Sequence, residues 1–95
     1  MGPQDAWLAI VNPASGRERA RAIWPSVERE LGRAGVRIDV ELTTRPHEGE
    51  AMACAAARAG RRRILVAGGD GSVHDVVNGI MNSGLDADDR VTLAV

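Results

Sequence analysis

The segment Gly68-Gly69-Asp70-Gly71-Ser72 combines three glycines, an acid and a hydroxyl directly after a short apolar run. Glycines allow a ligand to approach the backbone closely. If a helix follows, its free amide groups favour an anion such as phosphate. A carboxylate beside phosphates needs either Mg²⁺ or a hydroxyl whose proton it can accept. The loop is therefore a candidate phosphate-binding element, with Asp70 beside a cation or a hydroxyl.

The residues after the glycines indicate how that helix begins. Ser72 is in position to cap it, and Asp75 follows three residues later, which completes the Ser-x-x-acid pattern of a capping box. Val73, Val76, Val77, Ile80 and Met81 share one helical face. We therefore expect a helix that starts at Ser72 and points its first amides at the glycine loop.

A second polar loop, Asn12-Pro13-Ala14-Ser15-Gly16, follows the apolar run Trp7–Val11. In open α/β sheets, ligands bind beyond the carboxyl ends of the strands, where both loops are predicted to lie. Either loop alone could be an ordinary turn, because short glycine motifs occur by chance. The presence of both favours a binding site.

The elements that must position these loops alternate along the chain. Strands are predicted over Trp7–Val11, Val36–Leu42, Ile64–Ala67 and 91–95, and helices over Arg17–Ala34, Glu50–Ala59 and 72–81. Pro25 interrupts the first helix, so its regular part is expected to begin near Pro25. The order βαβαβαβ predicts a Rossmann-like three-layer α/β/α fold with a parallel sheet.

Composition excludes several classes of protein. The chain has 95 residues and a net charge of −1, so no overall field favours nucleic acid. One cysteine, Cys54, cannot form an intramolecular disulfide. No run approaches the roughly 20 apolar residues of a membrane-spanning helix, and the N-terminus lacks the pattern of a signal peptide. We expect a cytoplasmic protein with at most peripheral membrane contact.

Two common nucleotide motifs do not fit. A Walker A loop requires lysine, which the chain lacks, and the dinucleotide fingerprint would require glycine where His74 stands. Instead, "NPASG" followed by "AGGDGSVHDVVNG" resembles the catalytic domain of the diacylglycerol kinase family, which includes bacterial lipid kinases and sphingosine kinases. The resemblance covers essentially the whole chain.

This resemblance implies an ATP- and Mg²⁺-dependent lipid kinase in which the chain, residues 1–95, is the N-terminal part of the nucleotide-binding domain. Asp70 would be the catalytic residue, orienting Mg²⁺ or the acceptor hydroxyl, and no side-chain metal cluster is expected. The family pattern often has Thr, Asn and Glu where Ser72, His74 and Asp75 stand, and its match at Thr43 could shift to Thr44. By resemblance, the nucleotide site comprises Asn12, Pro13, Ala14, Ser15, Gly16, Thr43, Gly69, Asp70, Gly71, Ser72, Val73, His74 and Asp75.

Family members continue into a domain that holds the lipid, so the chain alone is expected to be inactive and to associate, for example as a homodimer. The full-length enzyme could also associate with membranes. Two alternatives stay open: an NAD kinase-like enzyme, since GGDG loops occur there too, and a non-catalytic nucleotide-binding module. His47 is interpreted as a plain loop residue, and Arg61-Arg62-Arg63 as a solvated run.

Overall fold

The computed structural model describes residues 6–84 and 92–94, and the side chains of 15–20 and 92–94 are not described. Strands and helices alternate along the chain, as the sequence predicts. The elements are β1 (Trp7–Val11), α1 (Ser15–Arg33), β2 (Ile38–Leu42), α2 (Glu48–Arg58), β3 (Arg63–Ala67), α3 (Asp70–Met81) and β4 (Thr92–Ala94).

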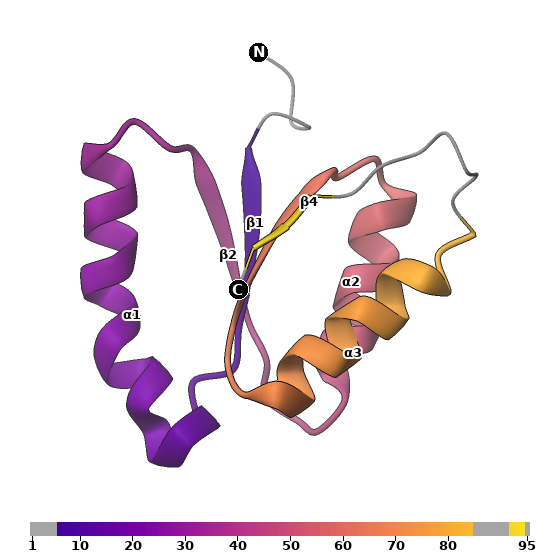
Figure 1. Cartoon of the computed structure of the whole chain (residues 1–95), viewed down its shortest axis with the longest axis horizontal. Coiled ribbons are helices and arrows are strands. Elements are labelled where there is room, and N and C mark those ends of the chain that lie inside the picture. The colour runs from indigo at the N-terminus through magenta and orange to yellow at the C-terminus, as the bar shows by residue number, and fades with distance from the viewer. Residues whose placement is uncertain (1–5, 85–91, 95) are drawn as a thin grey trace.

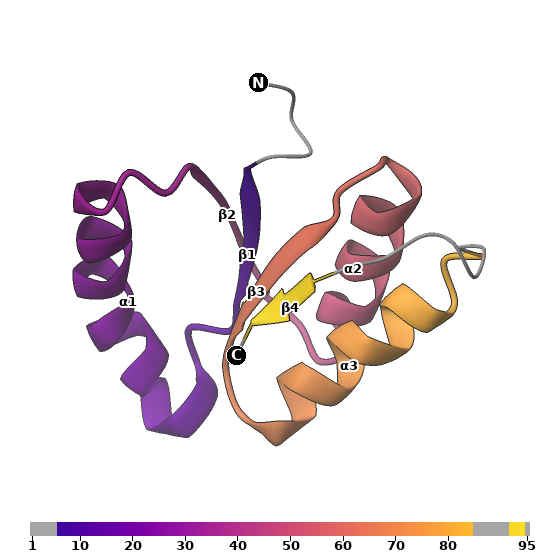
Figure 2. The same cartoon turned by 45° about the horizontal axis from the view of Figure 1, so that its top comes forward.

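The strands form one parallel sheet in the order β2-β1-β3-β4 (Figure 2). Helix α1 covers one face of the sheet, whereas α2 and α3 cover the other (Figure 1). The expected three-layer α/β/α arrangement is confirmed. Because the chain leaves β1 toward one face and β3 toward the other, a topological switch point lies between these two strands.

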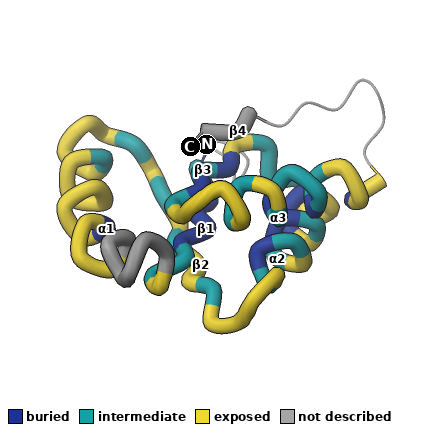
Figure 3. The backbone as a smooth tube through the Cα atoms, turned by 60° about the horizontal axis from the view of Figure 1, so that its bottom comes forward, coloured by how far each residue is buried: buried dark blue, intermediate teal, exposed yellow. Residues whose placement is uncertain are grey.

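The hydrophobic core is divided by the sheet, and its larger part lies under α2 and α3. Seven buried residues form that part: Leu8, Ile10, Ala53, Ala56, Ile64, Val66 and Val76. Among the described side chains, three buried residues lie under α1, namely Ala9, Val11 and Trp24. Figure 3 shows the same contrast, with exposed residues along much of α1. Trp24 is thus a core residue.

Helix α1 corrects one prediction. It runs without a break from Ser15 to Arg33 and contains Pro25, so the regular helix does not begin near Pro25. Pro25 is exposed, which allows water to hydrate the carbonyl that loses its helical partner. Gly35 follows the helix with a φ of 80°, as expected for a helix terminator.

Helices α2 and α3 approach each other closely at Gly79. A Cβ atom at this position would overlap the backbone carbonyl oxygen of Glu50 and lie 2.9 Å from Cβ of Ala53. Small residues on both helices therefore allow the close approach. This packing fixes the first turn of α2 beside α3, at the edge of the sheet where the candidate site lies.

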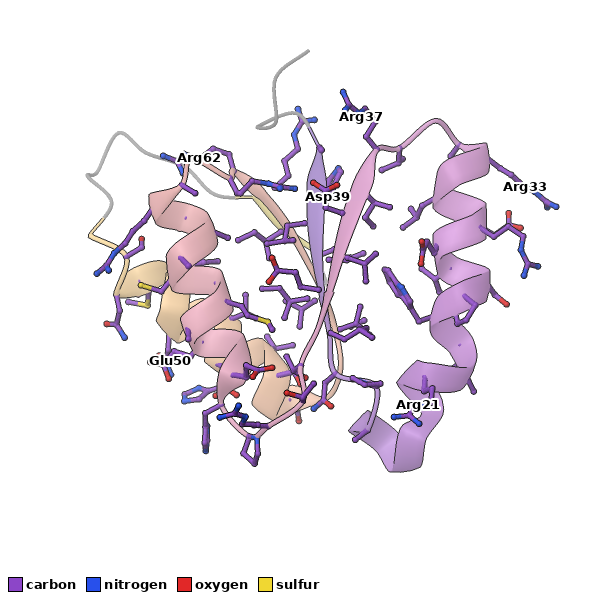
Figure 4. All side chains as sticks on the ribbon, turned by 180° about the vertical axis from the view of Figure 1, so that it is seen from behind. Arg21, Arg33, Arg37, Asp39, Glu50 and Arg62 are labelled. Atoms are coloured by element: carbon purple, nitrogen blue, oxygen red, sulfur yellow. The ribbon has the colours of Figure 1, made fainter. Side chains whose placement is uncertain are left out.

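The amino ends of the strands are held together by arginine side chains. Nη1 of Arg61 lies 3.0 Å from Oδ2 of Asp39 on β2, and the Arg61 side chain is only 17% exposed. Nη1 of Arg62 donates to the carbonyl oxygens of Ala57 and Arg61, each at 3.0 Å. Figure 4 shows Arg37, Asp39 and Arg62 at this end of the molecule. The interpretation of residues 61–63 as a solvated run is therefore wrong for Arg61.

Among the described helices, none combines the length and the hydropathy that crossing a bilayer requires.

Candidate functional site

A cavity of about 390 Å³ opens at the carboxyl ends of β1 and β2, beside the first turns of α2 and α3. Its position agrees with the rule that open α/β sheets bind ligands at this edge. Both loops that the sequence singles out contribute to it, together with the β2–α2 connection. The lining residues are Ile10, Asn12, Ala14, Thr43, Thr44, Arg45, Pro46, His47, Gly49, Gly71, Ser72 and Asp75.

The two predicted loops are linked by a hydrogen bond between side chains. Nδ2 of Asn12 donates to Oγ of Ser72 at 3.3 Å. Oδ1 of the same Asn12 accepts from the amide of Ala14 at 3.2 Å, so the whole side-chain amide is engaged. Gly68 permits this link, because a Cβ atom there would overlap Oγ of Ser72. This bond therefore fixes the distance between the loop after β1 and the first turn of α3.

The start of α3 corrects the capping-box prediction. The helix begins at Asp70, its N-cap is Gly69, and no side chain caps it. Ser72 lies inside the first turn, where its hydroxyl accepts from Asn12. Asp75 contacts His47 instead of closing a capping box. The sequence misplaced the start because glycines have low helix propensity, whereas here they fall in the first turn, where intrahelical bonds are not yet made.

This arrangement leaves the first-turn amides of α3 without a side-chain acceptor. The first helical bond of α3 runs from the amide of Val73 to the carbonyl oxygen of Gly69, at 3.1 Å. The amides of Asp70, Gly71 and Ser72 precede it. Free amides and the positive end of the helix dipole together favour an anion at this position.

Gly71 lines the cavity in an ordinary helical conformation. Its φ is not in the left-handed region, and a Cβ atom added there would meet no atom within 4 Å. A residue with a side chain could therefore adopt the backbone conformation of Gly71. The space beside Gly71 is open, so a side chain there would occupy volume that a ligand could use.

Asp70 is exposed at the start of α3 and does not line the cavity. Within the described residues, no side chain forms an ion pair or hydrogen bond with its carboxylate. No group of three or more His, Cys, Asp or Glu side chains in this part of the chain could hold a metal ion. Any cation at Asp70 would therefore need most of its ligands from a bound molecule or water.

The β2–α2 connection forms the outer wall of the cavity. Thr43 extends the sheet, since its amide donates to the carbonyl oxygen of Val11 at 2.8 Å. Thr44 is held by Glu48, whose Oε1 accepts from the Thr44 amide at 2.8 Å. His47 is the N-cap of α2, with Nδ1 3.2 Å from Oδ1 of Asp75. This wall is thus tied to both β1 and α3.

The structure groups about half of the predicted site residues around the cavity. Asn12, Ala14, Thr43, Gly71, Ser72 and Asp75 line it, whereas Pro13, Gly69, Asp70, Val73 and His74 do not. The side chain of Ser15 and the surroundings of Gly16 lie outside the described part of the chain.

His74 is exposed on α3, where Nε2 lies 2.9 Å from Nδ2 of Asn78 on the next turn. Sequence reasoning named Thr44 only as an alternative to Thr43 and missed five further cavity residues, which are Ile10, Arg45, Pro46, His47 and Gly49. The signal that could have identified most of them is the carboxyl end of the strand Ile38–Leu42, because parallel strands end at one edge.

Comparison with known proteins identifies relatives of one kind. The chain is 38% identical over 71 residues to a diacylglycerol kinase of Staphylococcus haemolyticus (strain JCSC1435), covering 75% of the chain and 22% of that protein. It is 32% identical over 75 residues to sphingosine kinase 1 of Mus musculus, covering 78% of the chain and 20% of that protein. The chain thus spans about a fifth of the length of these relatives.

The fold is also found in a solved structure. The structure superimposes on a crystal structure of a diacylglycerol kinase from Bacillus anthracis str. Sterne with a TM-score of 0.75 and 24% sequence identity, covering 98% of the chain and 32% of that protein. The sequence model of the diacylglycerol kinase catalytic domain matches residues 6–95. The chain therefore belongs to the diacylglycerol kinase catalytic domain family.

Proposed function

We propose that this chain is the ATP- and Mg²⁺-binding segment of a lipid kinase, which transfers the γ-phosphoryl group of ATP to a lipid hydroxyl. Family membership supports the reaction class. The observation that supports nucleotide binding most directly is the cavity at the switch point, with the uncapped first turn of α3 at its edge. Phosphate groups carry the negative charge that this turn favours.

In this proposal the nucleotide phosphates accept hydrogen bonds from the amides of Asp70, Gly71 and Ser72. Asn12 fixes the position of Ser72 through its side-chain bond. Helix α3 packs against α2 through Gly79, so its amides are held in place before the ligand arrives. Donors that need no rearrangement stabilise a ligand more than mobile ones do.

The residues present fit a magnesium ion. Mg²⁺ in phosphoryl-transfer sites keeps several waters and binds through one or two carboxylates together with substrate phosphates. Asp70, exposed beside the phosphate-binding turn, is the carboxylate that would hold it. When bound, the ion neutralises charge that develops on the phosphate oxygens.

The acceptor in this proposal is a lipid hydroxyl, which matches the names of the relatives. Its oxygen forms a bond to the γ-phosphorus, the bond to the β-phosphate oxygen of ATP breaks, and ADP leaves. The hydroxyl proton must be accepted by a base, and because Asp70 would hold Mg²⁺ in this proposal, that base is another group. An NAD kinase-like enzyme would use a soluble hydroxyl instead, so dependence on lipid vesicles separates the two reactions.

Titration of the chain with ATP by calorimetry, in the presence of Mg²⁺, tests nucleotide binding. Gly71→Val should reduce ATP affinity by at least tenfold, because valine fills the open space beside the first turn, while the fold persists. Gly32→Val is the matched control, since a Cβ atom there also meets no atom within 4 Å but Gly32 lies on α1 and does not line the cavity. Equal ATP affinity in both folded variants would contradict the proposed phosphate site.

A further inference from the structure

His47 and Asp75 form a contact between two opposite walls of the cavity. His47 belongs to the β2–α2 connection and Asp75 to the second turn of α3, and both line the cavity. Nδ1 of His47 lies 3.2 Å from Oδ1 of Asp75. A carboxylate can only accept, so Nδ1 carries the proton whenever this bond is made.

The two partners differ in how firmly they are held. The Asp75 side chain is 15% exposed, whereas that of His47 is 81% exposed. A Cβ atom at Gly49 would lie 3.8 Å from Cβ of Asp75 and 3.7 Å from Val76, so the first turn of α2 packs directly on α3 at this point. Asp75 is therefore the fixed partner, and His47 joins the exposed loop to it.

The backbone of His47 indicates that this contact is maintained against a conformational preference. Its φ of 64° makes it the only non-glycine residue with a positive φ in the described part of the chain. Such a conformation is unfavourable for residues with a Cβ atom and persists where the surroundings impose it. It brings the ring toward α3 instead of letting it cap α2, whose N-terminus has no side-chain cap.

The other attachments of this loop do not reach α3. Thr43 bonds to Val11 on β1, and Thr44 bonds to Glu48 at the start of α2. Arg45 and Pro46, which line the cavity between these points, are exposed. Among the described residues, the His47–Asp75 contact is thus the side-chain bond that joins the outer wall to α3, in addition to the packing of α2 on α3.

We propose that His47 is a positioning residue for the nucleotide, acting through Asp75. Building on the proposed function, the contact holds the Thr44–His47 wall at the width that ATP requires and fixes the orientation of the Asp75 carboxylate. Loss of the contact widens the cavity and increases the entropy that the ligand must remove on binding. The effect falls on nucleotide affinity rather than on the phosphoryl-transfer step.

The test uses His47→Gly, Asp75→Ala and the double variant. Glycine tolerates positive φ and has no side chain that could reach α3, and alanine keeps the helix but cannot accept a hydrogen bond. Each single variant should weaken ATP binding by roughly threefold to fivefold, the range that exposed ion pairs support, and the double variant by no more than either single one. In the full-length kinase, KM for ATP should rise by a similar factor while kcat stays near the wild-type value.

Glu30→Gln is the matched control, because it removes the exposed Arg33–Glu30 pair on α1, away from the cavity, and should leave ATP affinity unchanged. Hydrogen exchange in residues 43–50 of the ligand-free protein provides a readout that does not depend on ATP. Both single variants should exchange faster there. Wild-type exchange and wild-type affinity in both variants would overturn the proposal. If the wild-type protein binds no ATP, the proposed function fails, and the exchange data alone decide whether the contact holds the wall.

Discussion

The two ends of the sheet carry polar residues that are used in opposite ways. At the amino ends, the guanidinium of Arg61 is largely buried and contacts both Asp39 and the carbonyl oxygen of Ala6. At the carboxyl ends, Asp70 and the amides of the first turn of α3 remain exposed beside a cavity. At the amino ends, Arg61 is paired through its two terminal nitrogens, although its Nε is buried without a partner, whereas the carboxyl ends present their polar groups to solvent.

We therefore expect the amino ends of the strands to contribute to stability and the carboxyl ends to contribute to ligand binding. Buried polar groups cost free energy unless they are paired, so the arginines at the amino ends contribute to the fold by meeting carbonyls and a carboxylate. Exposed groups at the carboxyl ends contribute little to stability and are free to meet a ligand. Substitutions at the two ends should therefore change different measured quantities.

The largest effect is expected for Asp70→Asn at the carboxyl end. In the full-length kinase, turnover should fall by roughly a hundredfold or more, because the variant loses the charge that orients a cation. The free energy of unfolding of the chain should change by less than about 0.5 kcal/mol, since Asp70 is exposed. Vesicle-based kinase assays and thermal unfolding provide the two measurements. Unchanged turnover would leave Asp70 as a turn residue.

The opposite pattern is expected for Arg61→Ala at the amino end. The free energy of unfolding should fall by about 2 kcal/mol, because the substitution leaves carbonyl and carboxylate groups without their charged donor. ATP affinity should stay at the wild-type value. Asp39→Asn is a milder companion variant, since Asp39 is 63% exposed and its loss should cost less than about 1 kcal/mol. A reduced ATP affinity in folded Arg61→Ala would contradict the expectation that the amino ends of the strands contribute to stability and not to binding.

The smallest effects are expected for the Asn12–Ser72 bond, which should contribute both to stability and to ATP binding. Ser72→Ala should lower the free energy of unfolding by about 1 kcal/mol, the usual contribution of a single hydrogen bond. It should also weaken ATP binding by about threefold, because the distance between the loop after β1 and the first turn of α3 is no longer fixed. Denaturant unfolding and calorimetry measure the two effects separately.

The sequence predicted the fold from features that are local. Continuous apolar runs identified β1 and β3, alternation identified β2, and glycines at positions 35 and 60 marked helix ends that have positive φ in the structure. Both candidate loops were located correctly because parallel strands end at one edge of the sheet. The predicted last strand is confirmed for Thr92–Ala94, while Val91 and Val95 lie outside the described residues.

What the sequence by itself determined, then, is the order of the elements, the parallel sheet and the two loops at its carboxyl edge. Only the tertiary structure showed that Ser72 bonds to Asn12 instead of capping α3, and that His47 faces Asp75 across 28 positions of the sequence. Helix and strand patterns depend on neighbouring residues, which the sequence displays directly. Contacts between distant side chains depend on how closely the helices pack, which here is decided by the absence of a side chain at Gly79.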